Sequence, residues 1–138
     1  MYCNYSKDKF GNQLTFIIPS WMNLNEGEYQ RTLNEKHIPE ITGDGYFFDA
    51  SNGFDDTALF LYYLSLCEQD YFALLEKGWK PQQARQVLPN ALKTEVVMTG
   101  FVSDWMHFFD LRTASTAHPD MQKVASDLFK QFVDNKYI

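Results

Sequence analysis

Apolar residues recur at helical spacing in one long stretch of the chain. We predict a helix from about Asp55–Asp56 to Gly78, because acidic residues suit a helix N-terminus and glycine suits its end. Its apolar positions fall at i, i+3, i+4, i+7, i+11, i+14 and i+15, the spacing of one amphipathic face: Phe60, Tyr63, Leu64, Cys67, Tyr71, Leu74 and Leu75. Such a face is typical of a core or of a subunit interface.

Shorter elements are predicted before and just after this helix. Residues 13–18 (Gln-Leu-Thr-Phe-Ile-Ile) predict a strand that ends at Pro19. Residues 22–53 are polar and rich in turn residues, which indicates a long irregular excursion. Pro81 fits the first position of a short helix over residues 82–88. Residues 93–99 predict a strand or an extended segment.

Two further helices are predicted in the last third of the chain. Ser103 is a candidate N-cap for a helix that runs to about Leu111. Residues 118–120 (His-Pro-Asp) open a final helix. One face of that helix carries Met121, Val124, Ala125, Leu128 and Phe132. The predicted fold class is therefore α+β: a single helix-rich domain over residues 1–138 with a small antiparallel sheet.

Composition and charge exclude several classes of protein. A hydrophobic content of 45% supports a real core and argues against disorder. The formal net charge is -6, and no cluster of Lys and Arg exceeds two or three residues, so a nucleic-acid partner is not expected. Residues 59–66 form the most apolar stretch, which is far too short to span a membrane. The polar N-terminal run lacks the apolar region of a signal peptide, and we expect a cytoplasmic protein.

The two cysteines, Cys3 and Cys67, are far apart in the sequence and predict neither a disulfide framework nor a zinc site. Three histidines or carboxylates at metal-ligand spacing are not found either, so no metal is expected. Neither cysteine has an activating base or a cation as a sequence neighbour, which argues against a thiol nucleophile.

Two arginines stand out because they lie among apolar residues. Arg85 lies within a turn of a helix end at Pro89, and Arg112 follows two phenylalanines. A guanidinium in such a place either pairs with a carboxylate or binds an anionic ligand. Pairing is the more common arrangement, and Asp104 and Asp110 are available partners. His107, on the same predicted helix as Arg112, is by itself typical of a satisfied core or surface histidine.

Ordered blocks from residue 78 to residue 125 resemble a known family. They read Ala-Arg-Gln-Val-Leu-Pro (84–89), His-Phe-Phe-Asp-Leu-Arg (107–112) and Ala-His-Pro-Asp-Met (117–121). This order and spacing are similar to those of the flavin-dependent, ThyX-type thymidylate synthases. The resemblance covers nearly the whole chain but is loose over residues 23–52. A ThyX-like fold is therefore expected.

The resemblance implies roles at the matching positions. Arg85 and Arg112 would bind deoxyuridine monophosphate (dUMP), and Arg112 would be the catalytic residue that stabilises charge on the pyrimidine. His107 and Ser103 would contact the FAD cofactor. Methylenetetrahydrofolate would supply the one-carbon unit, NADPH would reduce the flavin, and the reduced FAD would be the hydride donor that yields thymidylate (dTMP). The missing thiol nucleophile agrees with a flavin-dependent route.

The resemblance also implies what this chain would lack. The family's Arg-His-Arg and Ser-x-Arg signature would lie directly before Tyr2, so the chain would be the C-terminal portion of such a protein. Losing several charge-assisted contacts, each worth roughly 1.5–3 kcal/mol, would leave the chain alone inactive. The family forms homotetramers with shared active sites, and a homo-oligomer is expected. The alternative is an inactive subunit that acts only in folding and assembly.

Overall fold

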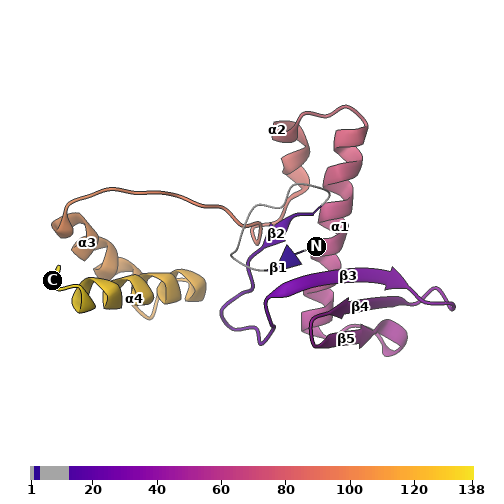
Figure 1. Cartoon of the computed structure of the whole chain (residues 1–138), viewed down its shortest axis with the longest axis horizontal. Coiled ribbons are helices and arrows are strands. Elements are labelled where there is room, and N and C mark those ends of the chain that lie inside the picture. The colour runs from indigo at the N-terminus through magenta and orange to yellow at the C-terminus, as the bar shows by residue number, and fades with distance from the viewer. Residues whose placement is uncertain (1, 4–12) are drawn as a thin grey trace. The chain divides into compact units, whose positions relative to one another are not determined.

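The computed structural model describes the backbone of residues 2–3 and the whole of residues 13–138. Contacts divide this part of the chain into two compact units. The first contains residues 2–3, 13–18 and 24–94, and the second contains residues 19–23 and 95–138. Helices and a small, mostly antiparallel sheet make up the fold (Figure 1), which confirms the α+β class. The single domain over residues 1–138 stays a prediction.

The sheet of the first unit has five short strands in the order β2-β1-β3-β4-β5. Strands β1 (Tyr2–Cys3) and β2 (Thr15–Phe16) pair in parallel, and β1 pairs with β3 in antiparallel orientation. The strand predicted over residues 13–18 is thus confirmed only at its centre. Residues 91–93 lie beside it, because the N–H of Ile17 donates to the carbonyl of Ala91 at 2.8 Å.

The prediction of an irregular excursion over residues 22–53 is wrong. Three antiparallel strands occupy it: β3 (Gly27–Leu33), β4 (Pro39–Gly43) and β5 (Tyr46–Asp49). The turn-forming residues lie in the short connections between these strands. The Asn34 carboxamide accepts the backbone N–H groups of residues 36 and 38 in the first turn. Asp44–Gly45 forms the second, with Gly45 at a φ of 69° that suits glycine in a two-residue hairpin loop.

Helix α1 (Asp56–Glu76) confirms the long predicted helix. Asp55 caps its N-terminus, since its carboxylate accepts the N–H of Ala58 at 2.7 Å. At the other end Gly78 adopts a φ of 94° and its N–H donates to the carbonyl of Leu75 at 3.0 Å. A short 3-10 turn, η1 (Ala50–Asn52), precedes the helix.

The face that α1 buries matches the predicted one only in part, at Leu64 and at Phe60, which packs against the core. Ala58, Leu61 and Leu64 are buried, whereas Tyr63 is 61% exposed. The helix is apolar on nearly all sides, so its apolar spacing alone did not identify the side that meets the sheet. Together with three sheet residues, the buried positions form the core of the first unit: Phe16, Tyr29, Ile41, Ala58, Leu61 and Leu64.

A short helix follows α1 at the predicted place. Helix α2 (Pro81–Ala84) continues directly into the 3-10 turn η2 (Arg85–Val87), and Pro81 occupies the first turn. Beyond an isolated bridge between Leu92 and Phe16, residues 93–101 have no regular secondary structure. The expected strand over residues 93–99 is therefore not formed.

The second unit consists of helices α3 (Val102–Arg112) and α4 (Pro119–Asp134). The ring of Phe109 is buried and lies edge-on to Phe129 and Phe132, with centroids 5.2 and 5.1 Å away. Of the face predicted on α4, Ala125 is buried but Met121 and Val124 are exposed. Two helices enclose too little space to bury a whole face of either.

Residues 19–23 belong to the second unit. The N–H of Ser20 donates to the Asp120 carboxylate at 2.7 Å, and the Trp21 ring lies edge-on to His118. His118 caps α4, because its Nδ1 accepts the N–H of Asp120. The helix predicted to open at residues 118–120 is thus confirmed. Within the described residues, no helix is long and apolar enough to cross a membrane.

Candidate functional site

Arg85 is the first residue of η2 and extends from the surface of the first unit. Ala84, directly before it, is fully buried, so the turn is anchored while the arginine side chain is exposed. The N–H of Leu88 donates to the Arg85 carbonyl at 3.1 Å and closes the turn before Pro89. No carboxylate of the described residues forms an ion pair with Arg85.

Arg112 is the last residue of α3 and is also exposed. The two expected partners do not pair with it. Asp104 instead accepts the N–H of Phe101 at 3.0 Å at the other end of the helix, and Asp110 makes no ion pair with any described residue. In the described part of the chain, both arginines therefore keep a free guanidinium. Such a group can take an anionic or carbonyl-bearing ligand.

Ser103 and His107 lie on one exposed face of α3, since residues four apart are neighbours on a helix. The prediction that Ser103 caps this helix is wrong. Phe101 occupies the cap position because Asp104 bonds its N–H, and Ser103 lies in the first turn. With about 100° per residue, Arg112 projects about 140° around the axis from His107. The side chains of His107 and Arg112 therefore leave the helix in different directions.

Arg85 belongs to the first unit and Arg112 to the second. Each unit is described by itself, so the expectation that both arginines contact one nucleotide stays a prediction. The roles of Ser103 and His107 at a flavin also stay predictions. What the structure adds is the local state of each side chain: exposed, and positioned by a capped helix or turn.

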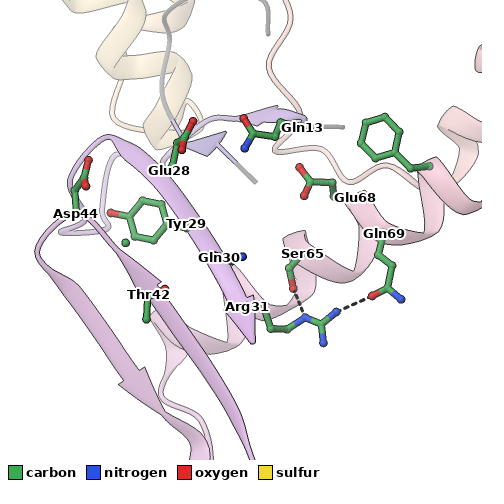
Figure 2. A pocket seen from close by; sticks show the side chains of 12 residues that line it. Gln13, Glu28, Tyr29, Gln30, Arg31, Thr42, Asp44, Ser65, Glu68 and Gln69 are labelled. Carbon is green, nitrogen blue, oxygen red and sulfur yellow. Dashed lines mark hydrogen bonds between the residues drawn. The ribbon is translucent and has the colours of Figure 1, made fainter. Parts of the chain in front are cut away.

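A cavity of about 660 Å³ lies in the first unit, between strand β3 and helix α1 (Figure 2). At one end the Arg31 guanidinium donates to Ser65 at 2.9 Å and to Gln69 at 2.6 Å. Glu28 and Asp44 lie at the other end. Three carboxylates and one guanidinium line the cavity in all, which disfavours a phosphate-bearing ligand there.

Sequence reasoning missed this cavity because one of its walls is formed by β3 and β4, in the region expected to be irregular. The signal was the alternation of Tyr29 and Arg31 in residues 27–33, which places both on the face that meets α1. The cavity contains none of the predicted site residues.

Cys67 is a poor nucleophile in this setting. Burial raises the pKa of its thiol, and the nearby Asp70 carboxylate raises it further. A higher pKa leaves less thiolate at neutral pH. The side chain of Cys3 lies outside the described residues. Among the described side chains, no group of three or more His, Cys, Asp or Glu could hold a metal ion.

Comparison with known protein families shows to which family the chain belongs. The family described as "Thymidylate synthase complementing protein" matches residues 1–135. The chain belongs to this family. The match extends through both units, so members of the thymidylate synthase complementing protein family are the right reference for all the candidate residues.

Curated relatives in this family are named flavin-dependent thymidylate synthases. The protein of Mycolicibacterium vanbaalenii is 37% identical over 62 residues, which are 45% of this chain and 25% of the relative. The protein of Geobacter sulfurreducens is 31% identical over 67 residues, 49% of this chain and 29% of the relative. The matched stretch thus spans about a quarter of each relative. No solved structure matches the chain.

The donors on the chain fit the chemistry of a flavin and a nucleotide. The Ser103 hydroxyl and the His107 imidazole are exposed hydrogen-bonding groups on one helix face. Arg85 and Arg112 supply unpaired guanidinium forks, which match phosphate and carbonyl oxygens.

Proposed function

We propose that this protein acts in the flavin-dependent synthesis of thymidylate. In that reaction dUMP is methylated to dTMP, with methylenetetrahydrofolate as the one-carbon donor, NADPH as the reductant and FAD as the cofactor. The observation that carries the proposal is the family match over residues 1–135. The names of the relatives and the unpaired arginines of the motif blocks support it.

Arg85 and Arg112 are the proposed ligands of dUMP. A guanidinium without a carboxylate partner keeps its full charge for a phosphate or a pyrimidine carbonyl. Arg112 is the proposed catalytic residue: it polarises the pyrimidine and stabilises the negative charge that develops as the ring carbon attacks the one-carbon unit. It is the last residue of a helix that packs through the buried Phe109.

Ser103 and His107 are the proposed contacts to FAD, which would supply the hydride once NADPH has reduced it. The hydroxyl and the imidazole would orient the cofactor by hydrogen bonds from one face of α3. Because Arg112 projects about 140° away from His107, the same helix can serve the cofactor and the nucleotide at once.

A homo-oligomer, a tetramer by the family resemblance, and a cytoplasmic location complete the proposal. The outward face of α1 supports the oligomer: Tyr63 is 61% exposed and Leu59 is 46% exposed. Large apolar side chains of this kind are enriched in subunit interfaces.

Flavin binding tests the proposal, because binding of FAD can be measured even where no dTMP is formed. The chain is titrated into FAD, and flavin fluorescence is followed with and without dUMP. We expect saturable quenching that the double substitution Ser103→Ala with His107→Ala weakens. In a parallel assay with all substrates, any dTMP formed should fall about a hundredfold or more in Arg112→Lys. A chain that binds no FAD and forms no dTMP would favour the non-catalytic alternative.

A further inference from the structure

A second cavity of the first unit, about 520 Å³, lies where α1 meets α2. Its walls come from the end of α1 and from the outer side of the α2–η2 turn, and they include Lys77, Trp79, Gln82 and Gln86. Arg85 is not among the residues that line it.

The backbone holds Trp79 in place. Gly78 ends α1 with a φ of 94°, and its N–H donates to Leu75 at 3.0 Å. The N–H of Trp79 then donates to the carbonyl of Leu74, also at 3.0 Å. The indole is 47% exposed and stacks on no ring of the described residues. The backbone of Trp79 is thus held by hydrogen bonds, and its indole is open to solvent.

Hydrogen-bonding groups surround this aromatic face. The amides of Gln82 and Gln86 form no side-chain hydrogen bond with any described residue. The neighbouring Gln83 does, because its Oε1 accepts the N–H of Lys80 at 2.9 Å. Two glutamine side chains are therefore available to a ligand. The Lys77 ammonium, which forms no ion pair within the described residues, adds one positive charge.

We propose that this cavity binds an adenine nucleotide. The base stacks on the Trp79 indole, as bases do on exposed aromatic side chains. A glutamine amide offers one acceptor and one donor, which match the amino group and the ring nitrogen of adenine. Lys77 pairs with the phosphate. The site is argued from its own residues and does not require thymidylate synthesis.

The combination of groups selects this ligand over two others. A neutral sugar could stack on Trp79 but would leave the Lys77 ammonium without a counter-charge. Free phosphate would use Lys77 alone and gain nothing from the indole. A nucleotide uses the ring, the amides and the ammonium together.

The test is a titration of the full chain with adenosine 5′-monophosphate (AMP), followed by isothermal calorimetry. We expect saturable binding that Trp79→Leu weakens about tenfold or more and that Trp79→Phe largely keeps. Lys77→Gln should weaken the binding of AMP but leave the binding of adenosine, which has no phosphate, unchanged. Gln82→Leu combined with Gln86→Leu should reduce the preference for AMP over uridine 5′-monophosphate.

Arg85→Gln is the matched control, because Arg85 lies on the same turn outside the cavity. It should leave AMP binding unchanged even where it weakens dUMP binding, so failure of this site and failure of the proposed function can be told apart. The proposal is overturned if AMP shows no saturable binding at millimolar concentration. It is also overturned if Trp79→Leu binds AMP as tightly as the parent chain, or if methyl glucoside binds in place of AMP.

Discussion

The Nε of Arg31 donates to the Ser65 hydroxyl at 2.9 Å and ties strand β3 to helix α1. The same guanidinium donates to Gln69 at 2.6 Å and lies 5.4 Å from the centre of the Tyr62 ring. Tyr62, Ser65 and Gln69 are spaced along one face of α1, so a single strand residue clamps two turns of the helix. Arg31 is a structural arginine, unlike Arg85 and Arg112, which pair with no carboxylate among the described residues.

Replacing Arg31 should therefore destabilise the first unit. We expect Arg31→Ala to lower the free energy of unfolding by about 1–3 kcal/mol, because two hydrogen bonds from a charged group are lost. Urea unfolding followed by circular dichroism measures the change. Arg85→Ala is the control and should change stability by less than about 0.5 kcal/mol. Equal effects of the two substitutions would show that the clamp contributes nothing.

Gly43 is predicted to tolerate no side chain. A Cβ on this residue would lie 2.5 Å from the Tyr29 ring, which is buried across the β3–β4 pair. We expect Gly43→Ala to cost about 1–3 kcal/mol through overpacking. At Gly100 the nearest atoms are 3.6 Å from the added Cβ, so Gly100→Ala should be almost neutral. Thermal unfolding of both variants checks the contrast, and an unchanged Tm for Gly43→Ala would argue against this packing.

Tyr46 carries a buried hydroxyl without a hydrogen-bond partner among the described residues. We expect Tyr46→Phe to raise the free energy of unfolding by about 1 kcal/mol at pH 8, since an unsatisfied polar group leaves the interior. Urea unfolding of the two proteins measures the difference. A less stable Phe variant would mean that the hydroxyl has a partner after all.

The same tyrosine predicts a pH dependence. Burial raises the pKa of Tyr46 from 10.0 to about 12, and the carboxylates of Asp55 and Asp56 and the hydroxyl of Tyr29 contribute. The folded state holds this proton more tightly than the unfolded state, so stability falls as the pH rises from 10 towards 12. Tyr46→Phe should lose less stability than the parent chain between pH 9 and pH 11. The free energy of unfolding of both proteins is measured by urea unfolding at each pH. An equal loss of stability with pH in the two proteins would contradict the raised pKa of Tyr46.

Local signals predicted the helices well. Asp55 and Gly78 marked both ends of α1 because capping depends on a few neighbouring residues. The buried face of α1 was predicted only in part, since the exposed Tyr63 and Leu59 resemble the apolar residues that meet the sheet. Strand β3 was missed because it buries only Gly27 and Tyr29 among polar residues. The Asp44–Gly45 pair was the strongest signal for the neighbouring β4–β5 hairpin.

The candidate site could be predicted only in part. The motif blocks identified Arg85 and Arg112, and the structure describes both as exposed and unpaired within the described residues. No local pattern reports which residues of two separate units meet, because that depends on packing between units and between copies of the chain. The Arg31 clamp and the Trp79 cavity were missed for a similar reason: each needs elements that only the fold brings together.

The most direct test is a calorimetric titration of the chain with dUMP, carried out on the parent, on Arg85→Gln, on Arg112→Gln and on the double variant. If both guanidiniums contact one nucleotide, each single substitution weakens binding about tenfold or more, and the two effects are not additive in the double variant. Arg31→Gln, which alters a structural arginine, should leave the affinity for dUMP unchanged. Parent-like binding of dUMP by both single variants would contradict the account.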